Sequence, residues 1–175
     1  STPNFYRVLE QSGNTLTELW TVPTSDNSGR TGSTVFDFNS DGEYEVVYRS
    51  QNFLVILEGS TGTILSQIPC QSGTGVEYPI TVDVDGDNQT EVLCGCETEL
   101  RAYRSGQTPW VPARPVWNQL TYFNANINDD LTVPQEQQLH HIVGDSIEMN
   151  NFLVQYADPD FLVPDAVLAM EVVDC

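Results

Sequence analysis

The sequence predicts an all-β fold: a partial β-propeller with two four-stranded blades, part of a preceding blade, and an irregular C-terminal segment. Two observations carry this prediction. Short β-branched and aromatic runs recur between turns rich in Gly, Asp and Asn. The sequence also repeats itself at intervals close to 46 residues (81 − 35). Repeats of about 40–50 residues, each with four strands, are typical of propeller blades.

The repeat is supported by two independent alignments. Val35–Val47 matches Thr81–Leu93 at an offset of 46 (81 − 35), and acidic residues fall on the same positions of both segments. Asn4–Trp20 matches Asn52–Ile68 at an offset of 48 (52 − 4), which makes it the back half of a further copy. Two alignments at nearly the same period indicate duplicated structural units.

The repeats divide the chain into five parts. We expect residues 1–30 to be the end of a preceding blade, and residues 31–76 and 77–116 to be two blades with acidic loops. Residues 117–157 would be a divergent closing segment, and residues 158–175 a linker with the start of a following domain. A propeller ring takes about four to eight blades, so these repeats cannot close one alone. Strand residues Tyr6–Leu9 should therefore bond to residues outside the chain or lie at an open edge. The apolar run Val167–Cys175 begins a following domain or docks back.

The composition of the chain limits the kinds of partner that it can bind. The chain has 25 acidic and 6 basic residues, for a net charge of −19. A chain this acidic is repelled by phosphate, which argues against nucleic acid and anionic membranes as partners. No run of 18 apolar residues is present, so direct membrane insertion is not expected. The carboxylates either keep the surface soluble or are gathered to hold cations, and their positions must decide.

Those positions favour cations, because each repeat carries an acidic turn between its first two strands. Loop positions 1, 3, 5 and 9 offer side-chain oxygens, and position 7 offers a backbone carbonyl: Asp37, Asn39, Asp41, Glu45 and Glu43, then Asp83, Asp85, Asp87, Glu91 and Gln89. Ca²⁺ takes 6–8 oxygen ligands, and alternate residues of a tight loop can supply them. The sequence therefore predicts two Ca²⁺ sites. The alternative is a pair of metal-free Asx-rich turns.

These loops are not EF-hands, because position 12 holds Tyr48 or Cys94 where the EF-hand requires Glu. The pattern resembles the FG-GAP and VCBS-type repeats of integrin α-subunit propellers and many bacterial surface proteins. The resemblance covers roughly Asn4 to Arg104, although the Phe-Gly/Gly-Ala-Pro signature is missing. It implies a Ca²⁺ loop between the first two strands of each blade. The tail after Trp110 is similar to segments of large secreted bacterial adhesin-like proteins, which implies export and a parent of many domains.

The four cysteines are Cys70, Cys94, Cys96 and Cys175, and their spacing fits no zinc motif. In the second repeat, the second strand should end near the residues that lead into the first strand. We therefore expect a disulfide between Cys70 and Cys96, with Cys94 as the alternative partner. A disulfide fits an extracellular or cell-surface protein.

Catalytic signatures are lacking in the sequence. No nucleophile elbow, zinc-protease motif or phosphate loop is present, and His140-His141 is interpreted as a polar surface pair. We expect a non-enzymatic extracellular calcium-binding propeller module of a larger secreted or cell-surface protein. It would serve as a scaffold or adhesion domain whose partners are other blades or domains of the same parent, or surface glycans and proteins. The alternative is a carbohydrate-binding propeller accessory to a secreted polysaccharide-degrading enzyme. The candidate sugar-stacking residues are Trp110, Trp117, Tyr122 and Phe123, for which buried packing is the favoured role.

Overall fold

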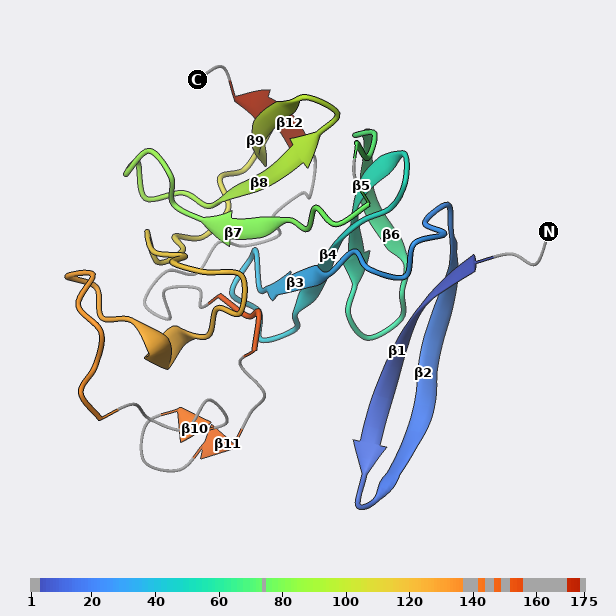
Figure 1. The fold of residues 1–175 in the computed structure, drawn as a ribbon, viewed down its shortest axis with the longest axis horizontal. Helices are drawn as coiled ribbons and strands as arrows, with labels where there is room; N and C mark the ends of the chain where they lie inside the picture. Colours follow the sequence, from blue (N-terminus) through green and yellow to red (C-terminus); the bar gives the residue numbers. More distant parts are fainter. Residues whose placement is uncertain are drawn as a thin grey trace.

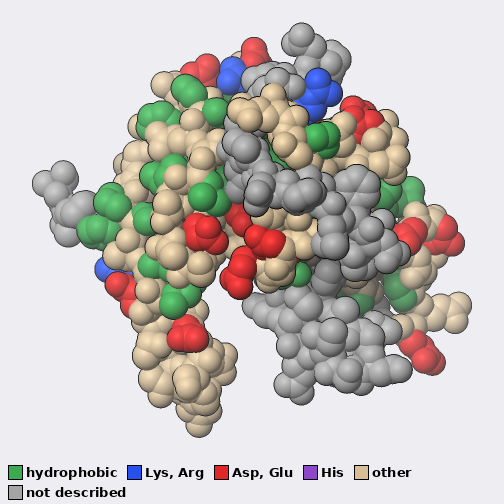
Figure 2. Space-filling view, turned by 180° about the vertical axis from the view of Figure 1, so that it is seen from behind, with side chains coloured by type: hydrophobic (Ala, Val, Ile, Leu, Met, Phe, Trp, Pro, Cys, Tyr) green, Lys and Arg blue, Asp and Glu red, His purple; other side chains and the backbone are tan. Residues whose placement is uncertain are grey.

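The computed structural model describes residues 4–73, 75–136, 142–143, 147–148, 152–155 and 170–173. These residues form an all-β protein of antiparallel sheets, and their one helical element is the short 3₁₀ turn η1 (Asn124–Asn126). The all-β prediction is therefore confirmed. No helix in this part of the chain is long and apolar enough to cross a lipid bilayer. Acidic side chains outnumber basic ones on the face drawn in Figure 2.

The first four-stranded sheet is a meander in the order β3-β4-β5-β6 (Figure 1). Its strands are β3 (Ser33–Phe36), β4 (Glu45–Arg49), β5 (Phe53–Glu58) and β6 (Ile64–Pro69). They fall within the segment for which a complete blade is predicted. The chain turns from β5 to β6 at Gly62, where φ is +74° and an added Cβ would lie 2.6 Å from the Trp20 ring. Glycine satisfies both constraints at that position.

The second four-stranded sheet takes its fourth strand from far along the chain. Its order is β12-β9-β8-β7, with β7 (Ile80–Val82), β8 (Glu91–Cys96), β9 (Glu99–Ser105) and β12 (Met170–Val173). β12 runs antiparallel to β9, with Met170 opposite Ser105 and Val173 opposite Ala102. The sequence leaves two interpretations of the last apolar run, and for residues 170–173 the second one holds: they dock back on the sheet as β12. Residues 158–169 lie outside the described part of the chain.

The partial copy at the start is a β-hairpin made of β1 (Asn4–Ser12) and β2 (Thr15–Thr24). It projects from the body of the molecule (Figure 1). Among the described strands β1 pairs only with β2, so Tyr6–Leu9 lies at an open edge, one of the two expected outcomes. The described strands make separate sheets and no closed ring. A fourth, two-stranded sheet joins β10 (Ile142–Val143) and β11 (Ile147–Glu148).

Apolar side chains fill the space between the two four-stranded sheets. Val47 and Ile56 of the first sheet belong to the same core cluster as Val92 and Tyr103 of the second, and all four are at most 1% exposed. Burying a Val, Ile or Leu side chain stabilises the fold by about 1.5–3 kcal/mol. This layer is therefore the main apolar contact between the sheets.

A second apolar cluster joins the hairpin to the other face of the first sheet. Trp20 of β2 packs with Tyr48 and Leu57, and its indole nitrogen donates a 2.7 Å hydrogen bond to the Gly59 carbonyl oxygen. The rings of Tyr6 and Tyr48 lie 4.4 Å apart between centroids. The three units therefore pack in chain order, each against the next.

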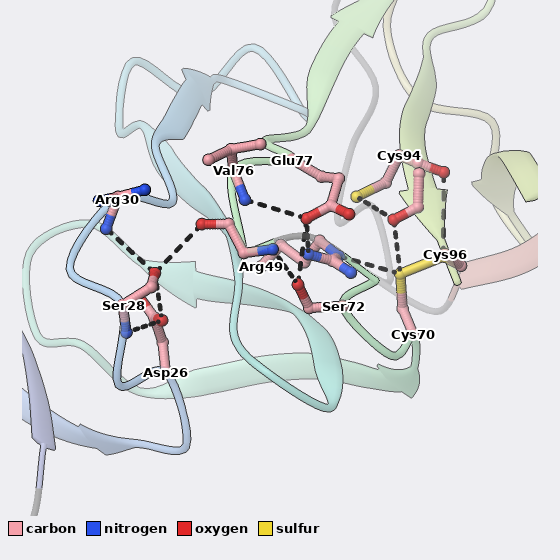
Figure 3. A network of polar contacts seen from close by, with 12 residues as sticks. Asp26, Ser28, Arg30, Arg49, Cys70, Ser72, Val76, Glu77, Cys94 and Cys96 are labelled. Carbon is pink, nitrogen blue, oxygen red and sulfur yellow. Dashed lines mark hydrogen bonds and ion pairs between the residues drawn. A yellow bond between two sulfur atoms is a disulfide. The ribbon is translucent and has the colours of Figure 1, made fainter. Parts of the chain in front are cut away.

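A disulfide joins Cys70, which follows β6, to Cys96 at the end of β8 (Figure 3). The predicted pairing is confirmed, and Cys94 remains a buried free thiol. Burial raises the pKa of that thiol to about 12, so it is protonated at neutral pH.

Beside the disulfide, the fully buried Arg49 connects the first sheet to the segment that leads into the second. Its Nη1 lies 3.1 Å from Oε2 of Glu77, the carboxylate that also accepts a 3.0 Å hydrogen bond from the Ser72 hydroxyl. Its Nε lies 3.5 Å from Cys70 Sγ (Figure 3). A buried guanidinium needs such a partner, because an unpaired buried charge costs several kcal/mol.

The segment after β9 folds back over the sheets. Trp110 is fully buried, with its ring 4.5 Å from that of Phe38 between centroids. The Tyr122 hydroxyl is 2.8 Å from Gln155 Oε1, and Gln155 in turn donates to the Val116 carbonyl oxygen at 3.1 Å. Gln155 also donates to the Thr81 carbonyl oxygen of β7 at 3.4 Å, which places part of the closing segment against the second sheet. His140 and His141 lie outside the described residues.

The first prediction concerns the disulfide. The Cys70→Ser/Cys96→Ser double variant should lower the free energy of unfolding by about 3 kcal/mol, because the bond closes a loop with a sequence separation of 26. Urea denaturation followed by tryptophan fluorescence measures the change. The matched control is Cys94→Ala, in which peptide mapping should still find the Cys70–Cys96 bond. An unchanged unfolding midpoint in the double variant would contradict the prediction.

Candidate metal centre

The two acidic loops occupy equivalent places in the two four-stranded sheets. Residues 37–45 join β3 to β4, and residues 83–91 join β7 to β8. Each loop begins with a buried aspartate and ends with a buried glutamate at the first position of the next strand. The strands on either side pair directly, Phe36 with Glu45 and Val82 with Glu91. This pairing holds both ends of each loop close together.

In the first loop, carboxylates accept hydrogen bonds from the loop's own backbone. Asp37 accepts from the amide nitrogens of Gly42 at 2.9 Å and Asp41 at 3.2 Å. Asp41 Oδ1 accepts from the Glu43 amide at 2.8 Å, and Asp41 Oδ2 accepts from the Asn39 side-chain amide at 2.8 Å. The loop is therefore wound around its aspartates, with their oxygens turned toward its interior.

The second loop repeats two of these bonds at an offset of 46. Asp83 Oδ2 accepts from the Asn88 amide at 3.2 Å, as Asp37 Oδ2 does from Gly42 (88 − 42). Asp87 Oδ1 accepts from the Gln89 amide at 2.8 Å, the equivalent of the bond from Glu43 to Asp41. The sequence repeat is thus a repeat of local structure.

Each loop contains two residues in the left-handed region. In the first loop they are Ser40 and Gly42, at φ 57° and 91°; in the second they are Gly86 and Asn88, at φ 77° and 64°. The tolerance of Gly42 and Asn88 for this conformation follows from their residue types. A positive φ is not expected for a serine, and in the sequence only the alignment of Ser40 with Gly86 indicates it.

The closing glutamates are the most buried acids of the loops. Glu45 is 4% exposed and Glu91 is 1% exposed. Their Oε2 atoms accept equivalent backbone bonds, from Phe38 N at 3.1 Å and Val84 N at 3.0 Å. Burial, with a contribution from the neighbouring aspartates, raises the pKa of Glu45 to about 8 and that of Glu91 to about 7. Each carboxylate is therefore costly to ionise without a positive partner.

Three carboxylates of the second loop converge. Asp83, Asp85 and Glu91 each offer an oxygen, and these oxygens lie within 4.8 Å of one another. Oε1 of Glu91 is buried and accepts no hydrogen bond. Buried polar atoms are nearly always satisfied, so an unsatisfied carboxylate oxygen here points to a missing positive partner. An all-oxygen group of this kind fits a hard cation.

The remaining predicted ligands take other places. Asp87 stands outside the converging group, and its two oxygens accept from the backbone and side-chain amides of Gln89. In the first loop, Asp37 and Glu45 occupy the positions of Asp83 and Glu91, and Asn39 takes that of Asp85. The first loop thus has a neutral amide where the second has a carboxylate.

One structural link between the loops cannot be predicted from the sequence. The backbone nitrogen of Val111 donates to the Phe38 carbonyl oxygen at 3.1 Å, beside the first loop. The carbonyl oxygen of the same residue accepts from the Thr90 hydroxyl at 2.6 Å, beside the second loop. A single peptide segment therefore touches both candidate sites.

Comparison with known proteins places the fold. No protein-family model and no curated protein sequence matches the chain. Its fold resembles that of a biofilm matrix protein. The crystal structure of Bap1 of V. cholerae aligns with a TM-score of 0.61 and 22% identity, covering 82% of this chain and 25% of that chain. The chain thus spans about a quarter of that protein's length, and at this identity the likeness shows a shared fold.

The second prediction concerns pH. In the metal-free protein, the free energy of unfolding should fall as the pH rises from about 5 to 8. Folding raises the pKa values of Glu45 and Glu91 to about 8 and about 7, so in this window the folded state holds protons that the unfolded state has lost. Their stabilising contribution is complete below the unfolded value and is lost as the pH passes the folded values.

Urea denaturation in chelator across this range measures the effect. The Glu45→Gln/Glu91→Gln variant serves as control and should show a flatter dependence, because its side chains no longer titrate. Equal slopes in the two proteins would refute the assignment to these glutamates.

Proposed function

We propose that the chain is a non-enzymatic, extracellular calcium-binding module that acts as a structural scaffold or adhesion domain. The observation that carries the proposal is the buried Glu91 carboxylate, whose Oε1 lacks a hydrogen-bond donor while its neighbours Asp83 and Asp85 add further negative charge. The two Ca²⁺ ions would be held in the 37–45 and 83–91 loops. Backbone carbonyls of Glu43 and Gln89 are the proposed additional ligands.

The donor set favours calcium over other metals. The candidate ligands are oxygens, with no His or thiolate among them, which disfavours Zn²⁺ and Cu²⁺. Mg²⁺ demands near-ideal octahedral geometry and keeps several waters, whereas Ca²⁺ accepts the irregular mixture of carboxylates and carbonyls that a short loop provides. A bound divalent ion would offset the repulsion among the carboxylates and let the buried glutamates ionise.

The proposed architecture is a partial propeller of the FG-GAP or VCBS type. Two sheets with matched acidic loops, preceded by a hairpin aligned with strands β5 and β6, support this assignment. The proposed partners are other blades or domains of the same protein, and surface glycans or proteins. A module of this kind holds its neighbours in place, so no reaction needs to be assigned to it.

An extracellular or cell-surface location has two supports. The disulfide between Cys70 and Cys96 is typical of proteins that fold in oxidising compartments. The fold is shared with a biofilm matrix protein, although at an identity that transfers no function by itself.

The carbohydrate-binding alternative has less support. Trp110 and Tyr122 are fully buried, with Trp110 against Phe38 and Tyr122 stacked on Trp117, so neither presents a free face to a sugar. Packing is therefore the role of these two residues. Trp117 borders a groove on the second sheet, and Phe123 is half-buried and forms a β-bridge with Phe152, so these two are the remaining aromatic candidates.

The third prediction tests calcium binding. Ca²⁺ at a hundredfold excess over Kd should stabilise the protein by about 2.7 kcal/mol per site, because it binds the folded form alone. Calorimetric melting curves with Ca²⁺ and with chelator measure the shift. Mg²⁺ at the same concentration should shift the melting temperature less.

Substitutions in one loop test which loop binds the ion. Asp83→Asn/Asp85→Asn should remove the contribution of the second loop and leave that of the first. The matched control, Glu10→Gln/Glu136→Gln, removes the same charge from exposed positions outside both loops and should respond to Ca²⁺ like the unmodified protein. An identical melting temperature with calcium and with chelator would exclude the proposed sites.

A further inference from the structure

The sheets of this protein have two unlike faces, which the repeat allows us to compare. We call the A face of a sheet the one directed toward the preceding unit, and the B face the one directed toward the following unit. In the first four-stranded sheet, Leu57 lies on the A face, in one cluster with Trp20 of the hairpin. Leu54 lies on the B face, in the core shared with the second sheet. Both leucines are at most 1% exposed.

The B face of the second sheet lacks this cover. Leu100 is the equivalent of Leu54 (100 − 54 = 46), and it pairs with Gly95 as Leu54 pairs with Arg49. Tyr103 of the same strand packs in the core shared with the first sheet, and successive residues of a strand alternate between faces, so Leu100, three positions earlier, lies on the B face. Leu54 is 0% exposed, whereas Leu100 is 75% exposed. The same position is core in one sheet and surface in the next.

A groove of about 440 Å³ runs along this exposed B face. Ile80, Leu93 and Leu100 line one side, and the segment containing Trp117 lines another. The second sheet therefore ends in a recessed apolar surface of the kind that the first sheet fills with its neighbour. Such surfaces on a soluble domain commonly mark interaction sites.

The hairpin leaves the complementary face exposed. Leu9 is the equivalent of Leu57 (57 − 9 = 48), whose next equivalent is Tyr103 (103 − 57 = 46). Leu57 and Tyr103 are each 1% exposed, because a preceding sheet covers them, but Leu9 is 52% exposed. Phe5, four positions before Leu9 and so on the same face of β1, is also exposed, at 40%. The hairpin thus presents an uncovered A face while its B face packs on the first sheet.

We propose that two copies of this chain associate head to tail, with the A face of one hairpin docked on the B face of the partner's second sheet. Within one copy, the B face of the first sheet already packs on the A face of the second sheet. The proposed interface between copies would repeat this packing of a B face on an A face. The hairpin and the β7–β9 sheet lie on opposite sides of the molecule (Figure 1). Both faces are accessible, since Leu9 is 52% and Leu100 75% exposed. A head-to-tail contact is heterologous, so each added copy again exposes one face of each kind.

Charge sets the conditions for this association. Each copy carries a net charge of −19, so the copies repel one another at low ionic strength. Salt at about 0.15 M shortens the Debye length to about 8 Å and weakens that repulsion. The inference rests on apolar faces and not on the proposed calcium sites. Its failure would leave calcium binding untouched, and the reverse also holds.

Sedimentation velocity of the 175-residue chain tests the proposal. The unmodified protein should form concentration-dependent oligomers in about 0.15 M salt, both with Ca²⁺ and with chelator. Leu9→Glu blocks the A face and Leu100→Glu blocks the B face, so each variant alone should be monomeric. Mixed in equal amounts they should form a dimer, because each retains the face that the other has lost. Val133→Glu, at an exposed position on neither face, is the matched control and should associate normally.

Each outcome either supports or overturns the proposed head-to-tail contact. A monomeric unmodified protein at about 100 µM would overturn the proposal, since that concentration is a hundred times a micromolar Kd. Self-association that survives in Leu100→Glu or Leu9→Glu alone would also overturn it, because it would indicate a symmetric contact. Folding of every variant is checked by circular dichroism and by the Cys70–Cys96 bond. A dimer formed only in the mixture would establish the head-to-tail contact.

Discussion

The apolar layer between the two four-stranded sheets is the constraint on which the rest of the structure depends. Val47 and Ile56 belong to one cluster with Val92 and Tyr103, the disulfide is part of the same cluster, and the buried Arg49 lies beside it. Because the two sheets repeat one unit, their acidic loops lie at equivalent places. The Val111 segment can therefore reach both loops. The candidate metal centres are thus positioned by packing, although their ligands are determined by local sequence.

Much of the repeat unit could be predicted from the sequence because its determinants are local. The strands of the first sheet follow from short β-branched and aromatic runs between turn residues, and the loop positions follow from the spacing of Asp37, Asp41 and Glu45. The Cys70–Cys96 bond follows from the expected path of neighbouring strands. In each case a short stretch of chain contains the information.

The remaining features depend on contacts between distant segments or on small differences in geometry. Nothing in the sequence of residues 170–173 names β9 as their partner, because backbone pairing is available to any extended segment. Asp87 has the spacing of a ligand, but that spacing does not predict that its two oxygens accept hydrogen bonds from the backbone and side-chain amides of Gln89. The convergence of Asp83, Asp85 and Glu91 depends on how the loop turns, which spacing alone does not determine.

The pairing of β12 with β9 has a consequence for how the molecule is made. The second sheet joins Ser105 to Met170, so its last strand arrives long after the first three have left the ribosome. Until then the free edge of β9 exposes backbone groups that can pair with any extended segment nearby. Such a long-range pairing also raises the contact order and slows folding. Folding should therefore pass through a stage in which the first sheet is complete and the second is still vulnerable to mispairing at this edge.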